Sequence, residues 1–138
     1  EISKKKFIID FNQFENTIKT NKSTEIIYGL RNFIGNANKF SNSKVEIILI
    51  SNKKETQLII SDDGPGFPKD LIDKHKLGEP YIRSADKAQI SKYGFGLGTF
   101  IGKTLLEKNF AKIRFDNLSN KSGAKVTIFW KNSDLNKI

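Results

Sequence analysis

The amino-acid sequence predicts an α+β fold: a two-layer sandwich in which a mixed, mostly antiparallel sheet carries helices on one face. Two segments have apolar residues at helical spacing, and short β-rich segments lie around them, several of them as sequential pairs joined by turns. Sequential pairs form antiparallel hairpins, which disfavours an all-parallel sheet. The helices are then expected to pack together over one face of the sheet.

The first part of the chain is predicted to contain a strand and a long helix. Lys5–Phe11 is short and rich in β-forming residues, and the polar stretch of residues 12–22 follows it. A helix is expected from Thr24 to about Phe40, with Ser23 or Thr24 as its N-terminal cap. Its apolar stripe consists of Ile26, Leu30, Phe33 and Ala37, widened by Ile27 and Ile34.

The middle of the chain is predicted to hold a hairpin and then a long loop. The turn SNKKET joins the strands Val45–Ile50 and Gln57–Ile60. The second strand runs into SDDGPGFP, which is too rich in glycine and proline for regular structure. Residues 69–92 show one helical turn at DLIDKH and are otherwise polar, as in the lids and binding loops of compact domains.

The last part of the chain is predicted to hold a second helix and a second hairpin. Apolar residues at helical spacing mark the helix Leu97–Lys108. The strands Lys112–Phe115 and Lys125–Trp130 flank a turn at NLSNKSG.

The composition indicates one globular domain with a basic surface. We expect a single domain over residues 1–138, cut from a longer protein, because the chain starts at Glu1 and contains no methionine. It has no cysteine, and no apolar run approaches the roughly 18 residues that cross a membrane. The net charge of +9 favours anionic partners, but the lysines are scattered without interleaved aromatic residues, so no nucleic-acid partner is expected.

Three alternating glycines, Gly94, Gly96 and Gly98, stand directly before the second helix. They fail the dinucleotide-binding pattern at Thr99 and the Walker pattern at Leu97. A pliable loop that leads into a helix N-terminus presents free backbone N–H groups and the positive end of the helix dipole. The segment therefore predicts an anion site, with a flexible connector as the alternative.

Two other short segments carry polar residues with a possible role in binding. Asn32, Asn36 and Lys39 share one stripe of the first helix, where amide oxygens suit Mg²⁺ and a lysine suits a phosphate; a solvated polar face is the alternative. Asp62 ends a strand and precedes Gly64 and Gly66, so the backbone can bend tightly beneath a flat ligand. The carboxylate would accept a hydrogen bond from an amine of that ligand. A surface turn is the alternative there.

Taken in order, these three segments resemble the N, G1 and G2 boxes of one ATP-binding domain. Sensor histidine kinases, DNA gyrase B, MutL-type repair proteins and a heat-shock chaperone family share this domain, which has the Bergerat-type fold. LGEPYIRS and SGAKVTIFW are similar to further segments of the kinases, so the resemblance covers nearly the whole chain. LGEPY and GLGTFIGKTLLEK look most like the bacterial redox-responsive sensor kinases.

The resemblance implies a set of site residues for ATP and Mg²⁺. Asn36 would hold the metal, Asn32 would support it, and Lys39 would meet a phosphate. Asp62 would recognise the adenine amine. The other contacts implied are Phe40 beside the nucleotide, Gly64 and Gly66 beneath it, Tyr81 and Arg83 in the lid, and Gly94, Phe95, Gly96, Leu97, Gly98 and Thr99 around the triphosphate.

The resemblance also implies a reaction. Relatives that hydrolyse ATP place a glutamate base one turn before the metal asparagine, where this chain has Asn32, so hydrolysis is expected to be poor. The expected activity is donation of the γ-phosphate to a protein side chain. No residue of this chain is assigned a catalytic role, and His75 lacks the context of a phosphoacceptor.

The implied partners are a histidine-bearing dimerisation domain of the same kinase and a response regulator. The domain itself is expected to be cytoplasmic, and the resemblance is compatible with a homodimeric parent anchored in the inner membrane. Two other readings stay open: a serine kinase of the anti-sigma type and a non-catalytic module that binds ATP to regulate a partner. Ala124 departs from the threonine common in related domains, and Gly35 inside the first helix is explained at most by close packing.

Overall fold

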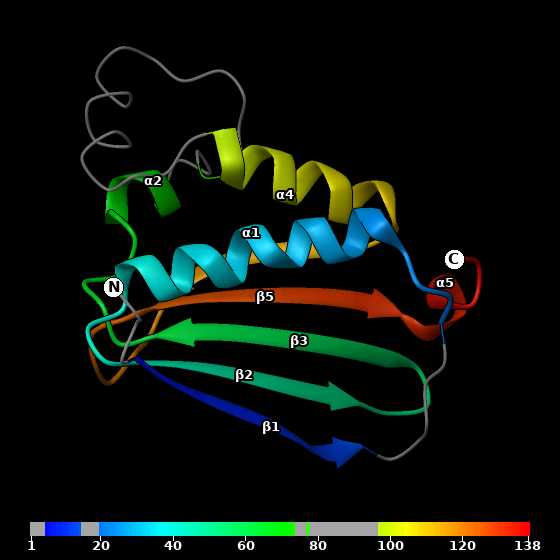
Figure 1. The fold of residues 1–138 in the computed structure, drawn as a ribbon, viewed down its shortest axis with the longest axis horizontal. Coiled ribbons are helices and arrows are strands. Elements are labelled where there is room, and N and C mark those ends of the chain that lie inside the picture. The colour runs from blue at the N-terminus through cyan, green and yellow to red at the C-terminus, as the bar shows by residue number, and fades with distance from the viewer. Residues whose placement is uncertain (1–4, 15–19, 74–76, 78–96) are drawn as a thin grey trace.

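The computed structural model describes residues 5–14, 20–73, 77 and 97–138. In these residues a five-stranded sheet lies beneath two long helices (Figure 1). The strands are β1 (Lys6–Phe14), β2 (Lys44–Ser51), β3 (Glu55–Asp62), β4 (Lys112–Asn117) and β5 (Ala124–Lys131). The helices are α1 (Thr24–Phe40), α2 (Lys69–Asp73), α4 (Leu97–Lys108) and α5 (Asn132–Leu135).

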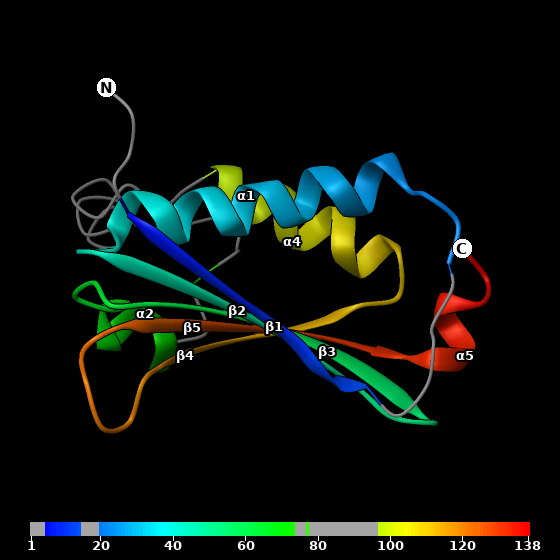
Figure 2. The same cartoon turned by 60° about the horizontal axis from the view of Figure 1, so that its bottom comes forward.

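The sheet is mixed, with the strand order β1-β2-β3-β5-β4. β1 and β2 are parallel because α1 connects them as a crossover, whereas the other three pairs are antiparallel. Figure 2 shows α1 and α4 on the same side of the sheet. The predicted fold class, a mixed and mostly antiparallel sheet with helices on one face, is therefore confirmed.

Helix α1 begins and ends as its sequence predicts. The Ser23 side chain accepts a hydrogen bond from the backbone N–H of Ile26 at 3.2 Å, which caps the first turn. At the other end the N–H of Ser41 donates to the carbonyl of Ala37 at 3.0 Å. The buried residues of α1 are Gly29, Phe33 and Ala37.

Helices α1 and α4 approach each other closely because glycine lies on both of them. A Cβ atom on Gly29 would come within 2.8 Å of Leu106 Cγ, and one on Gly102 within 3.1 Å of Asn32 Cβ. Gly35, by contrast, has nothing within 4 Å of such an atom, so close packing does not explain it. The two helices pack backbone to backbone, and this brings the start of α4 against the polar stripe of α1.

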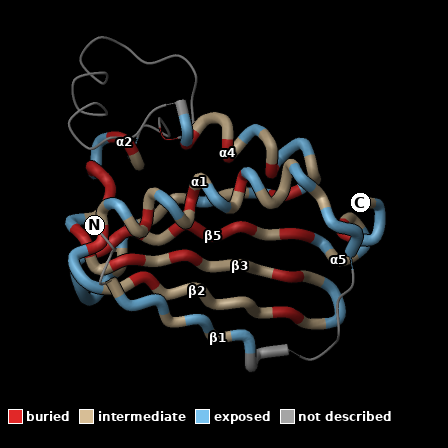
Figure 3. The backbone as a smooth tube through the Cα atoms, viewed as in Figure 1, coloured by how far each residue is buried: buried red, intermediate tan, exposed pale blue. Residues whose placement is uncertain are grey.

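The hydrophobic core fills the space between the helix layer and the sheet. Figure 3 shows buried residues along the strands below α1 and where the two helices meet. Phe33, Ile60, Leu106 and Ile128 are each 2% exposed or less. The indole N–H of Trp130 donates to the carbonyl of Asn109 at 3.1 Å, which satisfies the polar edge of this buried ring.

Two features of the fold differ from the expected elements. The hairpin strands extend beyond their predicted ends, although Asp62 ends β3 as expected of a carboxylate at a strand end. The short helix α5 (Asn132–Leu135) was not predicted, because its three polar residues and one leucine are too few to show a helical apolar pattern. Of the helices that the structure describes, none is both long and apolar enough to cross a membrane.

Candidate nucleotide site

A pocket that opens to solvent lies between α1, the start of α4 and one end of the sheet. Its wall is largely apolar, with only a few polar groups, which is the usual character of a small-molecule site. The helices contribute Phe33, Asn36, Ala37, Phe40 and Thr99, and the sheet and its turn contribute Ile60, Asp62, Gly66, Phe67, Phe115, Ala124 and Val126.

Asp62 is the only carboxylate that lines this pocket among the residues the structure describes, and it is 6% exposed. Its Oδ1 accepts hydrogen bonds from the backbone N–H groups of Gly64 at 2.9 Å and Ala124 at 3.4 Å. No donor among the described residues bonds to its Oδ2. Burial raises the pKa of Asp62, and the two backbone donors offset only part of that rise. Asp62 is thus a buried acceptor, fixed on one oxygen and open on the other.

The turn after Asp62 can be built only with glycine at two positions. A Cβ on Gly64 would lie 2.1 Å from the carbonyl oxygen of Phe40, and Gly66 has a φ of 86°. The Asn117 side chain bonds to both the N–H and the carbonyl of Phe67, at 2.7 and 3.0 Å. The close approach at Gly64 sets the turn against the end of α1, and the Asn117 bonds fix Phe67, which lines the pocket, to the end of β4.

The asparagine stripe of α1 faces the first turn of α4. The Asn36 side-chain amide donates to the hydroxyl of Thr99 at 3.1 Å, and Thr99 is 3% exposed. Asn32 donates to the carbonyl of Tyr28 at 3.0 Å, and its Oδ1 would lie 3.3 Å from a Cβ on Gly98. The structure therefore brings together Asn32, Asn36 and the start of the helix that the glycine-rich segment precedes.

Of the remaining candidate residues, the structure describes three and leaves five outside its described ranges. Phe40 lines the pocket, whereas Lys39 is exposed, with its ammonium 5.3 Å from the centre of the Phe40 ring. For Leu97 the structure gives the backbone, as the first residue of α4. Outside the described residues lie Tyr81, Arg83, Gly94, Phe95 and Gly96.

The sequence analysis missed the aromatic part of the pocket. Phe115 packs against Phe33 with ring centres 5.9 Å apart and against Phe67 at 5.7 Å, edge to face. Phe67 could have been found, because it directly follows the glycine turn. Phe115 could not, since only the pairing of β4 with β5 brings it to this end of the sheet.

A search for metal-binding clusters finds no group of three or more His, Cys, Asp or Glu side chains within the described ranges. Mg²⁺ does not need such a cluster, since it commonly takes one or two protein ligands and completes its shell with water and substrate phosphates. The amide oxygen of Asn36 has no hydrogen-bond partner among the described residues, because the bond to Thr99 uses the NH₂ group. The amide oxygen of Asn36 can therefore serve as the protein ligand of a magnesium ion whose other ligands are water and nucleotide phosphates.

The family described as "Histidine kinase-, DNA gyrase B-, and HSP90-like ATPase" has a sequence model that matches residues 21–134. The match takes in α1, the turn after Asp62 and α4, so the chain belongs to this family of ATPase domains. The family resemblance inferred from the sequence is confirmed.

The sensor histidine kinase RegB of Cereibacter sphaeroides is 36% identical in an alignment 121 positions long, which covers 77% of this chain and 26% of RegB. This chain thus spans about a quarter of that relative's length. The solved structure of the mycobacterial sensor histidine kinase MprB has a TM-score of 0.68 and 25% identity, covering 91% of this chain and 82% of that one. The catalytic domain of the histidine kinase ThkA has the same TM-score with 19% identity, over 91% and 78% of the two chains, and shows the shared fold.

Proposed function

We propose that this domain binds Mg-ATP in the pocket around Asp62 and donates the γ-phosphate to a histidine on the dimerisation domain of the same kinase. The observation that supports this best is the buried carboxylate of Asp62 in a largely apolar pocket: its Oδ1 is held by two backbone N–H groups, and no donor in the described part of the chain bonds to its Oδ2. The family membership supports ATP as the ligand, and relatives named as sensor histidine kinases support the class of reaction.

Adenine recognition follows from the chemistry of this end of the pocket. The open Oδ2 of Asp62 would accept a hydrogen bond from the exocyclic amine, and Phe40 and Phe67 would cover the faces or edges of the flat base. Guanine would present a carbonyl oxygen where adenine has the amine, and two acceptors would then face each other in a buried place. The pocket is therefore expected to select adenine over guanine.

Phosphate and metal binding would fall to the other end of the pocket. The Asn36 amide oxygen would coordinate Mg²⁺, Asn32 would support it from the same helix face, and Lys39 would approach a phosphate from solvent. The N-terminus of α4 would place its N–H groups toward the triphosphate. The further contacts proposed are Tyr81, Arg83, Gly94, Phe95 and Gly96, together with Leu97, Gly98 and Thr99 in the first turn of α4. Magnesium, when bound, supplies neutralisation of the phosphate charge.

The same site argues for transfer to a protein and against rapid hydrolysis. Asn32 occupies the position one turn before Asn36 where a hydrolytic relative would carry a glutamate base. Of the described residues that line the pocket, only Asp62 is acidic, and it belongs to the base-binding end. In phosphoryl transfer the protein mainly positions the groups and neutralises charge, so an incoming histidine can replace an activated water. A response regulator would be the next acceptor, and the proposal is compatible with a homodimeric parent that is membrane-anchored and holds this domain in the cytoplasm.

The test is transfer of radiolabelled γ-phosphate from Mg-ATP to the dimerisation domain of the same kinase, added as a separate protein. We expect label that is lost in acid and kept in alkali, as for a phosphohistidine N–P bond. Label with the opposite stability would indicate a serine kinase, and ATP binding without any label would indicate a regulatory module. Either result would overturn the proposed reaction.

A further inference from the structure

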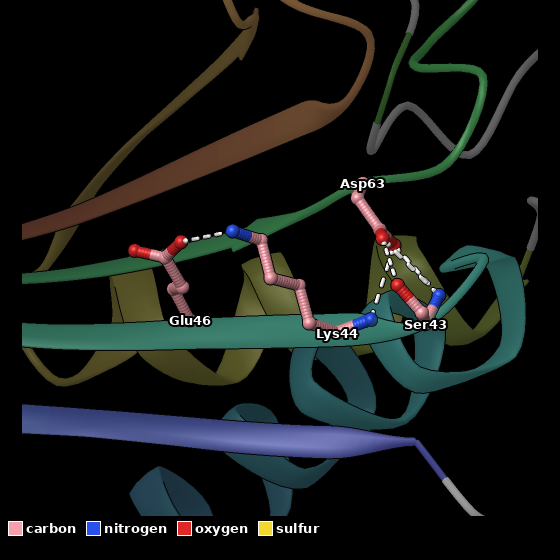
Figure 4. Close-up of polar contacts among 4 residues, drawn as sticks. All are labelled: Ser43, Lys44, Glu46 and Asp63. Carbon is pink, nitrogen blue, oxygen red and sulfur yellow. Dashed lines mark hydrogen bonds and ion pairs between the residues drawn. The ribbon is translucent and has the colours of Figure 1, made fainter.

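Asp63, the residue after Asp62, forms a compact set of hydrogen bonds with the α1–β2 turn (Figure 4). Its Oδ1 accepts from the backbone N–H groups of Asn42 at 2.8 Å, Ser43 at 3.0 Å and Lys44 at 3.2 Å. Its Oδ2 accepts from the Ser43 hydroxyl at 2.6 Å and the Ser43 N–H at 3.2 Å. The Asn42 side chain also donates to the Asp63 carbonyl at 2.9 Å. We refer to Asp63 with Asn42, Ser43 and Lys44 as the Asp63 clasp.

The Asp63 clasp stands where the ladder between β2 and β3 ends. The last residue pair of that ladder is Val45 with Asp62. At the next position the carboxylate of Asp63 takes the N–H of Lys44 and two further N–H groups in place of strand pairing. The chain is thereby released from the sheet and turned into the glycine segment beneath the pocket.

The clasp joins the two walls of the pocket that carry its chemistry. On one side it holds the turn that directly follows α1, the helix with Asn36 and Phe40. On the other side it holds the end of β3, whose last residue is Asp62, the neighbour of Asp63 in the chain. The two backbones already touch here, since a Cβ on Gly64 would lie 2.1 Å from the carbonyl oxygen of Phe40. Any change in the clasp would therefore alter the position of Asp62 relative to α1.

A carboxylate is the group that this arrangement needs. All five contacts to its oxygens come from N–H or O–H donors, so an asparagine would have to turn its NH₂ group toward at least one of them. The Ser43 hydroxyl, and after it the backbone N–H groups of the turn, lower the pKa of Asp63 well below its ordinary value. Asp63 is thus charged at every pH at which the protein would work, so the hydrogen bonds of the clasp do not change with pH over that range.

We propose that Asp63 is a positioning residue for nucleotide binding: the Asp63 clasp sets the distance between the adenine contact at Asp62 and the magnesium contact at Asn36. This inference rests on the proposed function of the pocket. Asp63 itself does not line the pocket and would touch neither base nor phosphate. Its effect would be transmitted through the backbone to Asp62 on one side and through the α1–β2 turn to Asn36 on the other.

The test compares the variants Asp63→Asn and Ser43→Ala with the control Glu46→Gln, by calorimetric binding of ATP and ADP and by phosphotransfer kinetics. Glu46 forms an ion pair with Lys44 at 3.2 Å, beside the clasp but outside it (Figure 4). For Asp63→Asn we expect the dissociation constants of ATP and ADP to rise by the same factor, about tenfold, because the displaced contact is common to both. KM should rise with them while kcat stays unchanged, and Glu46→Gln should match the wild type.

Ser43→Ala keeps the test decisive if Asp63→Asn does not fold. It removes one of the five contacts, and we expect a smaller rise in both dissociation constants. If Asp63→Asn does fold, adding Ser43→Ala to it should raise these constants no further, because both substitutions disrupt the same set of bonds. Wild-type dissociation constants for both nucleotides in folded Ser43→Ala would overturn the inference and leave the proposed function intact, and so would wild-type values in a folded Asp63→Asn. So would a fall in kcat without a change in KM. A wild-type domain that binds no adenine nucleotide would overturn both.

Discussion

Asn36 of α1 donates a 3.1 Å hydrogen bond to the hydroxyl of Thr99, in the first turn of α4. The two residues are 63 positions apart in the sequence, and each lies in a segment that by itself has an ordinary structural explanation. Their contact joins the polar stripe of one helix to the N-terminus of the other. It engages the NH₂ group of Asn36, and no donor in the described ranges bonds to the amide oxygen, which suits a ligand of a phosphate-bound magnesium ion.

Replacing Asn36 with alanine is expected to remove the magnesium dependence of ATP binding while the fold is kept. In the presence of Mg²⁺ the affinity should fall at least about tenfold, toward the value measured in a chelator, because a direct metal ligand is lost. Calorimetric titration with and without Mg²⁺ measures this. The matched control is Asn38→Ala, two residues further along α1 and roughly 200° around the helix. If Asn36→Ala retained the full effect of magnesium, Asn36 would not be the metal ligand.

Replacing Asp62 with asparagine is expected to abolish adenine recognition without unfolding the domain. The asparagine can keep the bonds from Gly64 and Ala124 through its Oδ1 but would present an NH₂ group to the amine of adenine. The loss of ATP affinity should be about 100-fold or more, since a buried donor would face a donor. A titration of Mg-ATP into the variant checks this, and binding within a few-fold of the wild type would contradict the role of Asp62.

The same substitution should also change how stability depends on pH. Because burial raises the pKa of Asp62, the folded domain binds more protons than the unfolded chain between the ordinary value of 3.8 and the raised value. Over that window this carboxyl makes the free energy of unfolding fall as pH rises, and Asp62→Asn lacks the effect. Denaturant unfolding should therefore show Asp62→Asn gaining stability relative to the wild type as pH rises through the window. If Asp62→Asn instead lost stability relative to the wild type as pH rises, the fold would stabilise the charged carboxylate and the pKa of Asp62 would be lowered, which contradicts this prediction.

Alanine at Gly29 and at Gly35 should have opposite effects, although both glycines lie on α1. At Gly29 a Cβ would collide with Leu106 and approach the carbonyl of Gly102, so we expect a loss of roughly 1–3 kcal/mol as the helices separate. At exposed Gly35 nothing lies within 4 Å, and the gain in helix propensity should stabilise the domain by up to about 1 kcal/mol. Thermal unfolding of the two variants measures both. If the two substitutions changed the stability equally, α1 and α4 would not be in close contact at Gly29.

The sequence predicted the local features of this domain well, and its long-range features only in part. Ser23, the apolar stripe of α1 and the turn around Gly64 could be recognised because each depends on neighbours within a few residues. The parallel pairing of β1 with β2 and the place of β5 between β3 and β4 have no local signal. For the same reason the contact of Asn36 with Thr99 and the position of Phe115 in the pocket could not be derived from spacing.

The most direct test of the account is an NMR titration of the isotopically labelled chain with Mg-ATP. The account predicts concerted chemical-shift changes at the backbone amides of residues 62–64 and 66, at the side-chain amide of Asn36 and at Thr99, saturating together, with Mg-GTP causing none of them. Unchanged resonances at both Asp62 and Asn36 under saturating Mg-ATP would contradict it, because the nucleotide would then not bind between these two residues.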